Sequence, residues 1–141
     1  MEGEIKIGGN YQPWVRHGDT LYLSGQIPRV GDTVMLPGRV GEDLGLAEAQ
    51  EAAQICALRA LALMRQALGS LDRIRQVLRI TVCVQCTAEF TQHSEVADGA
   101  SGVLQAVLGD AGRPTRTSVG VFQLPKNAAV EVDLIAAVVD V

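Results

Sequence analysis

The segment that most constrains the fold of this chain is a predicted helix over residues 46–68. It is rich in Ala, Leu, Glu, Gln and Arg, it contains no Gly or Pro, and Gly69 follows it as a helix-ending residue. One stripe at helical spacing is apolar, and its small side chains favour close packing on a sheet: Ala53, Ala57, Ala60, Leu61, Met64 and Leu68. The other side is expected to face solvent, with Glu48, Glu51, Arg59, Arg65 and Gln66.

Strands are predicted on both sides of this helix in the sequence. Before it, alternating residues predict strands over 11–16 and 20–24 and a short one over 33–36. After it come a long strand over 77–86, a weaker helix over 90–108, and strands over 114–121 and 130–135. The order β-β-(β)-α-β-α-β-β is typical of an α+β two-layer sandwich, in which two helices cover one face of a sheet. A length of 141 residues suits a single domain, residues 1–141.

The long strand predicts two unlike sheet faces. Leu78, Ile80, Val82 and Val84 alternate with polar or small residues and are expected to face the helices. The uncovered face is then expected to be small and semi-polar, with Tyr22, Ser24, Thr81, Cys83, Ser118, Gly120, Ile135 and Ala137. Such a face fits a sheet that packs against copies of itself.

The last two strands carry the chemistry that the sequence offers. Arg116 opens the first strand, Glu131 lies early in the second, and residues 125–127 supply the turn between them. If the two strands pair antiparallel, both charges lie on one sheet and line one cleft. A guanidinium binds a carboxylate through two hydrogen bonds, and a carboxylate in a cleft orients or deprotonates water. Each residue is also compatible with an ordinary surface position on a strand.

Composition and charge narrow the function classes. The net charge of −4 leaves no basic footprint, so no nucleic-acid partner is expected. No run approaches the roughly 18 apolar residues of a membrane span, and the N-terminus lacks the pattern of a secretory signal. A soluble, cytoplasmic protein without a membrane partner is therefore expected.

The cysteines and histidines give no predicted metal site. The three cysteines are expected to be free thiols. Cys83 and Cys86 lie three apart on a strand and so point to opposite faces, and His17 and His93 have no partners in the sequence. We expect neither a metal nor a cofactor.

Two blocks of sequence resemble the RidA (YjgF) family. Residues 114–119 read Pro-Thr-Arg-Thr-Ser-Val, 124–125 read Leu-Pro and 130–136 read Val-Glu-Val-Asp-Leu-Ile-Ala, while 22–28 read Tyr-Leu-Ser-Gly-Gln-Ile-Pro. The blocks stand in the family's order and at about its spacing, so the resemblance covers nearly the whole chain. It implies a chorismate-mutase-like fold with a mixed sheet, and a homotrimer with ligand clefts between subunits.

The resemblance also implies roles for individual residues. Arg116 would hold the substrate carboxylate, and Glu131 would position water with help from Ser24. Tyr11 would wall the cleft, and Ser118 is a further expected substrate-binding residue. Gly25 is also expected at the substrate, because a glycine there lets ligand or chain approach the backbone closely. Ser118 stands where many members carry Cys, and a segment with Asp98 stands where the family often shows Val-Asn, so a divergent RidA-like branch is expected.

Three functions follow as hypotheses. The first is hydrolytic deamination of small reactive 2-imino or enamine acids to 2-keto acids and ammonia. The second is a non-catalytic trimer that binds small carboxylates as a sensor or scavenger, which needs Arg116 but no general base. The third is an endoribonuclease-like activity, against which the acidic charge balance and the lack of a catalytic histidine pair count.

Overall fold

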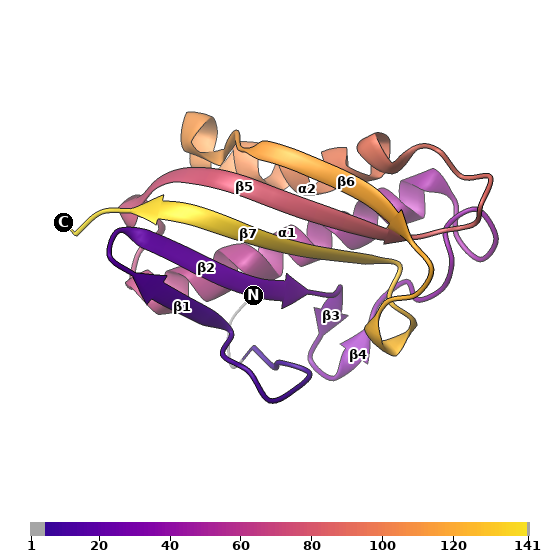
Figure 1. The fold of residues 1–141 in the computed structure, drawn as a ribbon, viewed down its shortest axis with the longest axis horizontal. Coiled ribbons are helices and arrows are strands. Elements are labelled where there is room, and N and C mark those ends of the chain that lie inside the picture. The colour runs from indigo at the N-terminus through magenta and orange to yellow at the C-terminus, as the bar shows by residue number, and fades with distance from the viewer. Residues whose placement is uncertain (1–4, 141) are drawn as a thin grey trace.

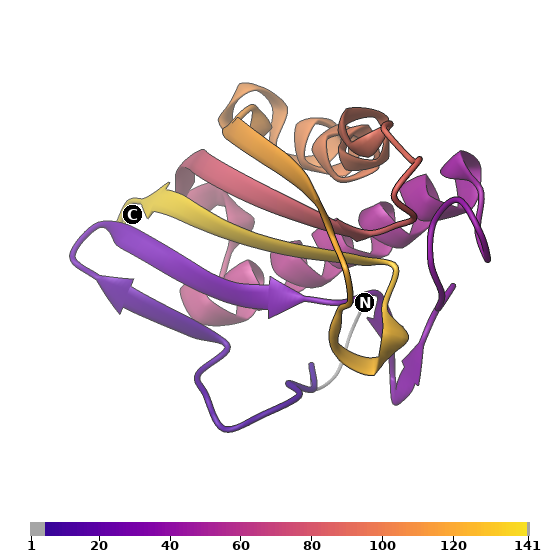
Figure 2. The same cartoon turned by 45° about the vertical axis from the view of Figure 1, so that its right-hand side comes forward.

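The computed structural model describes residues 5–140, and a five-stranded sheet forms its centre. The sheet strands are β1 Trp14–His17, β2 Thr20–Gln26, β5 Ile74–Gln85, β6 Thr115–Val121 and β7 Val130–Val138, in the order β1-β2-β7-β5-β6. A small hairpin, β3 Arg29–Val30 with β4 Thr33–Val34, follows β2. Helices α1 (Leu46–Leu68) and α2 (His93–Leu108) lie together behind the sheet, as Figures 1 and 2 show. The predicted α+β two-layer sandwich is confirmed.

The sheet is mixed, and its strand order corrects one expectation. Strand β6 runs parallel to β5, whereas β7 pairs antiparallel with both β5 and β2. Strands β6 and β7 are therefore not neighbours, because β5 lies between them. The parallel pair needs a crossover, which α2 supplies between the end of β5 and the start of β6. Antiparallel pairing of the last two strands, considered from the sequence, is wrong.

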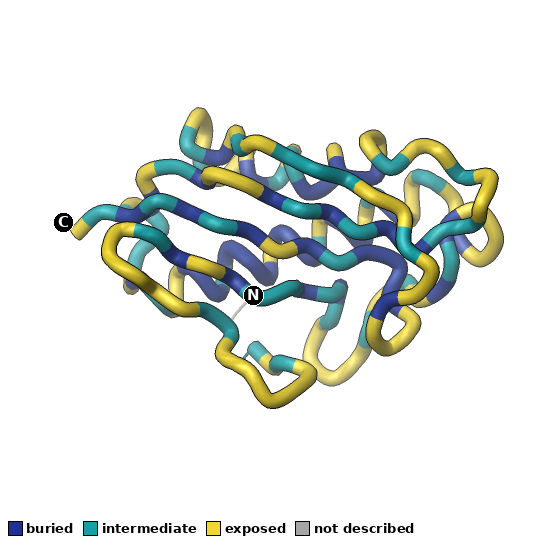
Figure 3. Tube along the Cα trace, in the orientation of Figure 1, coloured by how far each residue is buried: buried dark blue, intermediate teal, exposed yellow. Residues whose placement is uncertain are grey.

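The core lies between the helices and one face of the sheet. Helix α1 has the predicted bounds, Gly69 ends it in the left-handed conformation, and the whole predicted apolar stripe is buried. Figure 3 shows the burial alternating along the central strands, with α1 buried on its sheet-facing side. In α2, Gly99 allows close packing on α1, since a Cβ at this position would lie 2.3 Å from the Gln50 carbonyl oxygen. Val107, predicted on the apolar side of α2, is exposed instead.

Arg59 is the largest departure from the predicted helix faces. It was expected on the solvent side of α1, but only 3% of it is exposed. The residue follows Ala52 and Cys56 and precedes Leu63 at helical spacing, and all three are buried. Arg59 therefore lies on the sheet-facing side of α1, where its charge needs internal hydrogen-bond partners.

Three positions in β5 and β6 also face the opposite way from the prediction. The β5–β7 pairing shifts by one residue between Val77 and Arg79, so Leu78 is exposed while Val77 is buried. In β6, Ser118 pairs with the buried Val82, so its side chain lies on the helix face of the sheet. Gly120 lies on the same face, beside Val84. The uncovered face carries Thr117 and Val119 at this edge instead.

Candidate functional site

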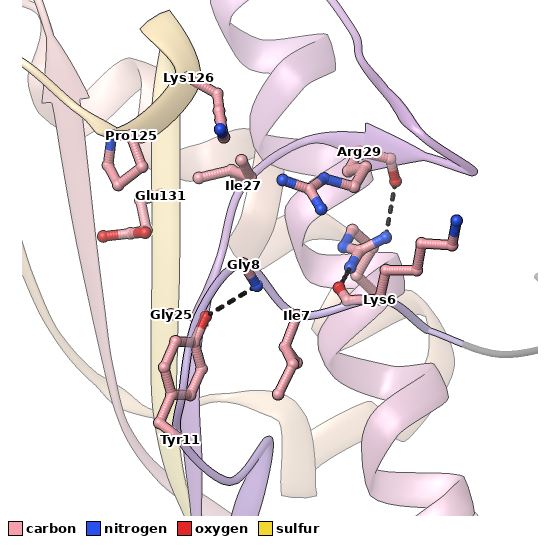
Figure 4. A pocket seen from close by; sticks show the side chains of 11 residues that line it. Lys6, Ile7, Gly8, Tyr11, Gly25, Ile27, Arg29, Pro125, Lys126 and Glu131 are labelled. Atoms are coloured by element: carbon pink, nitrogen blue, oxygen red, sulfur yellow. Dashed lines mark hydrogen bonds between the residues drawn. The ribbon is translucent and has the colours of Figure 1, made fainter.

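A pocket of about 140 Å³ opens beside the end of β2. Its walls come from the N-terminal segment, the β2–β3 connection, α1 and the turn before β7: Lys6, Ile7, Gly8, Tyr11, Gly25, Ile27, Arg29, Arg59, Pro125, Lys126 and Glu131. Figure 4 shows Tyr11 and Glu131 on one side and Arg29 and Lys6 on the other. Four cationic residues and one acid thus share the pocket, which brings together three of the predicted site residues, Tyr11, Gly25 and Glu131.

Glu131 packs directly over the Gly25 backbone. A Cβ on Gly25 would lie 2.9 Å from Glu131 Cδ, so only glycine leaves room for this carboxyl group. Glu131 is half-buried on the uncovered face of the sheet, opposite Cys83. Burial, and then the neighbouring charge of Asp133, raise the pKa of Glu131 above its ordinary value. This carboxyl group therefore holds a proton at higher pH than an exposed glutamate does, which makes it a stronger general base.

Arg59 fixes the wall of the pocket opposite Glu131. Its Nη1 donates to the Arg29 carbonyl oxygen at 2.8 Å, and its Nη2 donates to the Lys6 carbonyl oxygen at 2.8 Å. Its Nε donates to Gln26 Oε1 at 3.3 Å. These bonds tie the N-terminal segment and the β2–β3 connection to α1. The sequence contained a signal for this role, because Arg59 falls in register with buried positions of the helix.

Arg116 belongs to a different cluster, against α2. Its Nη1 donates to Asp98 Oδ1 at 2.9 Å and to Ser101 Oγ at 3.0 Å. Its Nη2 donates to Ser94 Oγ at 2.8 Å and to the Ser94 carbonyl oxygen at 3.3 Å. The guanidinium is thereby held in one orientation with a carboxylate already on it. The sequence did not indicate Ser94 or Ser101 as partners, since only the packing of α2 on β6 brings them there.

Arg116 and Glu131 lie on opposite faces of the sheet in one chain. Arg116 pairs with Ile80, whose side chain is buried under the helices, and its bonds run to α2. Glu131 pairs with Cys83, which is three residues from Ile80 along β5 and therefore on the opposite face, so Glu131 points away from the helices. The expectation that both charges line one cleft is therefore wrong for a single chain.

The other predicted site residues lie in or beside the glutamate pocket, or with Arg116 on β6. Ser24 lies next to Gly25 but outside the pocket lining, and its Oγ donates to the Gln12 carbonyl oxygen at 2.7 Å. The Tyr11 hydroxyl accepts a long hydrogen bond of 3.4 Å from the Gly8 amide. Ser118 lies two residues after Arg116 on the same face of β6. One cluster is thus Tyr11, Gly25 and Glu131, and the other is Arg116 and Ser118.

His93 has a partner that the sequence did not reveal. Its Nε2 lies 3.3 Å from Cys86 Sγ, beside Gly120 at the end of β6. Burial raises the pKa of the Cys86 thiol more than the nearby Arg39 charge lowers it, so the thiolate is disfavoured. Over residues 5–140, His, Cys, Asp and Glu form no group of three or more that could hold a metal ion. In the same part of the chain, no helix has both the length and the apolar character for a membrane span.

Comparison with known proteins gives a family match over most of the chain. Residues 3–138 match the family described as "YjgF/chorismate_mutase-like, putative endoribonuclease". Protein TCP17 of Trypanosoma cruzi is 43% identical over 125 residues, which are 88% of this chain and 78% of that protein.

Solved structures share the whole fold. The protein Atu1372 of Agrobacterium tumefaciens, described as of unknown function, superposes with a TM-score of 0.91 at 39% identity, over 96% of this chain and 86% of that one. RidA from an Antarctic Psychrobacter superposes with a TM-score of 0.66 at 26% identity, over 94% of this chain and 92% of that one.

Proposed function

The chain belongs to the YjgF/chorismate-mutase-like family, and we propose that it hydrolyses small 2-imino acids to 2-keto acids and ammonia in clefts between the subunits of a homotrimer. The observation that carries this proposal is the division of the site residues between two faces. Each chain presents an arginine cluster at β6 and a separate glutamate pocket beside β2. A second copy that lays its β6 edge against the pocket would complete one cleft.

The uncovered face of the sheet supports assembly with further copies. Val15, Tyr22, Leu78 and Val119 are all between 40% and 53% exposed on strands of this sheet. Apolar side chains gathered on one face mark a surface for protein contact. Closed rotational symmetry would give every chain the same contacts, with the arginine cluster of each chain at the pocket of the next.

In this cleft Arg116 would bind the substrate carboxylate. Its Nη1 already donates to Asp98 Oδ1 at 2.9 Å, in an ion pair whose acid side chain is 64% exposed. Exposed ion pairs of this kind contribute little free energy, so exchange of Asp98 for a substrate carboxylate would cost little. The serine hydroxyls around Arg116 would keep the guanidinium in place during the exchange.

Glu131 would act on the water that attacks the imine. Water oxygen bonds to the imine carbon while Glu131 takes one water proton, and the nitrogen receives a proton as the C=N π bond opens. The hydroxyl group then gives its proton to the nitrogen, the C–N bond breaks with its electron pair going to the nitrogen, and the C=O bond forms, so that ammonia and the keto acid leave. The raised pKa of Glu131 makes its carboxylate a stronger base toward the water proton than an exposed glutamate. Every atom comes from the imino acid and water, so the step requires no cofactor.

The test is ammonia release from iminopropanoate generated freshly in the assay. Wild-type protein should release ammonia faster than buffer, and Arg116→Ala should abolish this acceleration while the fold is retained. Glu131→Gln should lower turnover by roughly 10²-fold with pyruvate affinity preserved, since it removes the base but not the anchor. Wild-type protein that binds pyruvate through Arg116 yet accelerates nothing would establish the non-catalytic carboxylate binder instead.

An RNA-cleaving activity is the second candidate, because the matching family's description includes that term. The net charge of −4 disfavours it, since binding to a phosphate backbone depends on cationic residues. RNA cleavage that persists through purification, and that Arg116→Ala removes, would support it.

A further inference from the structure

The cations of the pocket differ in what holds them. Lys6 pairs with Asp32, and Arg59 is bound to two backbone carbonyls and to Gln26. Among residues 5–140, nothing accepts a hydrogen bond from the Arg29 guanidinium, and its Nε is buried without a partner. A buried charged donor without an acceptor is costly and rare in folded proteins, so Arg29 requires a separate explanation.

The backbone of Arg29 is fixed although its guanidinium is unpaired. Its amide donates to the Ile27 carbonyl oxygen at 2.7 Å, and its carbonyl oxygen accepts the bond from Arg59. Figure 4 shows the guanidinium turned toward Ile27 on the pocket side. Gly8 packs beside it, because a Cβ there would lie 3.8 Å from Arg29 Nη2, in ordinary van der Waals contact. The guanidinium of Arg29 is thus held in a defined position by the backbone and is left without an acceptor.

Most charges around Arg29 are positive and favour an anion there. The exception outside the pocket lining is Asp32, whose pKa is lowered first by its bond with Lys6 and, more weakly, by the charge of Arg29. Burial, and next the charge of Arg29, lower the pKa of Arg59, so the two guanidinium groups repel each other. Lys126 and Lys6 bring the positive charges of the lining to four, and the only acid among the lining residues is Glu131. An anion would avoid Glu131 and lie on the side of the pocket where Figure 4 shows Arg29.

We propose that Arg29 is a specificity-determining residue that selects ligands with a second carboxylate. The inference rests on the proposed function: Arg116 of one subunit takes the carboxylate beside the imine, and Arg29 of the next takes the carboxylate of the substrate side chain. The substrate class is therefore a 2-imino dicarboxylate of four or five carbons. The volume of about 140 Å³ suits such a group, since an engineered cavity of roughly 150 Å³ holds benzene.

The experiment compares two stable keto acids with five-carbon chains, 2-oxoglutarate and 2-oxopentanoate, by calorimetric titration. Wild-type protein should bind the dicarboxylate at least about tenfold more tightly than the monocarboxylate. Arg29→Gln should bring this ratio close to one while leaving the affinity for 2-oxopentanoate unchanged. Arg29→Lys should keep an intermediate ratio, because it retains the charge and loses the fork. Arg75→Gln removes the same charge from an exposed position outside the pocket and should keep the wild-type ratio.

The outcomes separate this inference from the proposed function. A wild-type ratio near one, no binding of 2-oxoglutarate, or an unchanged ratio in Arg29→Gln would overturn the role of Arg29. The variant should fold, because the backbone rather than the side chain of Arg29 is bonded to Arg59. Failure of the proposed function would appear elsewhere, as wild-type protein that releases no ammonia faster than buffer. A dicarboxylate preference lost in Arg29→Gln would support the Arg29 site even then.

Discussion

Replacement of Arg59 by Met tests how the pocket is built. The change keeps an unbranched side chain in the buried position and removes three hydrogen bonds, two of them at 2.8 Å to backbone carbonyls. A hydrogen bond from a charged donor contributes roughly 1.5–3 kcal/mol, so the two short bonds set the scale at about 3–6 kcal/mol. Part of this is regained, because burial of the Arg59 charge and its repulsion by Arg29 disfavour the wild-type state.

We therefore expect Arg59→Met to lower the free energy of unfolding by about 2 kcal/mol, and the Tm by roughly 6–8 °C for a domain of this size. Urea unfolding and thermal melts at one fixed protein concentration measure both quantities. Hydrogen exchange should also become faster in the N-terminal segment, which loses its bond at the Lys6 carbonyl.

Arg65→Met is the matched control, because Arg65 is exposed on the same helix. It should change the stability by no more than about 0.5 kcal/mol. Equal stability of the two variants would refute the view that Arg59 holds the N-terminal segment and the β2–β3 connection against α1.

Three further predictions concern the two halves of the proposed cleft. Gly25→Ala should abolish ammonia release, because its Cβ would displace the Glu131 carboxyl group, whereas Gly102→Ala, with open space around it, should leave the activity intact. Arg116→Lys should fail in pyruvate titrations nearly as badly as Arg116→Ala, since an ammonium cannot reproduce the fork; full affinity would contradict bidentate binding. Burial raises the pKa of Glu131, so the folded state binds this proton more tightly than the unfolded chain and loses stability as pH rises above 4.5 through the raised pKa. Glu131→Gln should therefore match wild type in urea titrations at low pH and exceed it at pH 7, and the opposite trend would contradict the burial of Glu131.

The elements of the fold were predictable because each has a strong local signal. Helix α1 was predicted with its observed bounds, since its composition favours a helix throughout and Gly69 ends it. The turn before β7 was predicted from Pro125 to Asn127, and both Lys126 and Asn127 adopt positive φ there. Signals of this kind act over a few residues and do not depend on tertiary packing.

Strand pairing was not predictable from the same kind of signal. Alternation in β6 is compatible with an antiparallel partner in β7 and with the parallel partner β5 that the structure shows. The residues of β6 are mostly small or polar, so neither face is marked as apolar, and Ser118 was assigned to the wrong face. In β5 the register shift between Val77 and Arg79 adds one residue to the strand and turns Leu78 to the other face. No local sequence pattern predicts such a bulge.

The site was predictable as residues but not as geometry. Tyr11, Gly25 and Glu131 do share a pocket, whereas Arg116 lies on the other face of the sheet. Alternation shows which residues of a strand share a face, but only the pairing with neighbouring strands decides which face of the sheet that is. The pairing was unknown from the sequence. Arg29 escaped notice because an arginine beside a turn is ordinary in sequence, and only the buried, unpaired Nε distinguishes it.

Subunit mixing tests the shared cleft most directly. The Arg116→Ala homotrimer is expected to be inactive and the Glu131→Gln homotrimer to keep about 1% of the wild-type rate, because every cleft lacks one of the two groups. When the two variants are unfolded together and refolded at equal amounts, a cleft is complete where the Arg116-bearing chain precedes the Glu131-bearing chain around the ring. Random assembly makes about one cleft in four complete, so ammonia release should recover to roughly a quarter of the wild-type rate. Mixtures that stay as inactive as the separate variants, although the chains have exchanged, would contradict a cleft formed by Arg116 and Glu131 of different subunits.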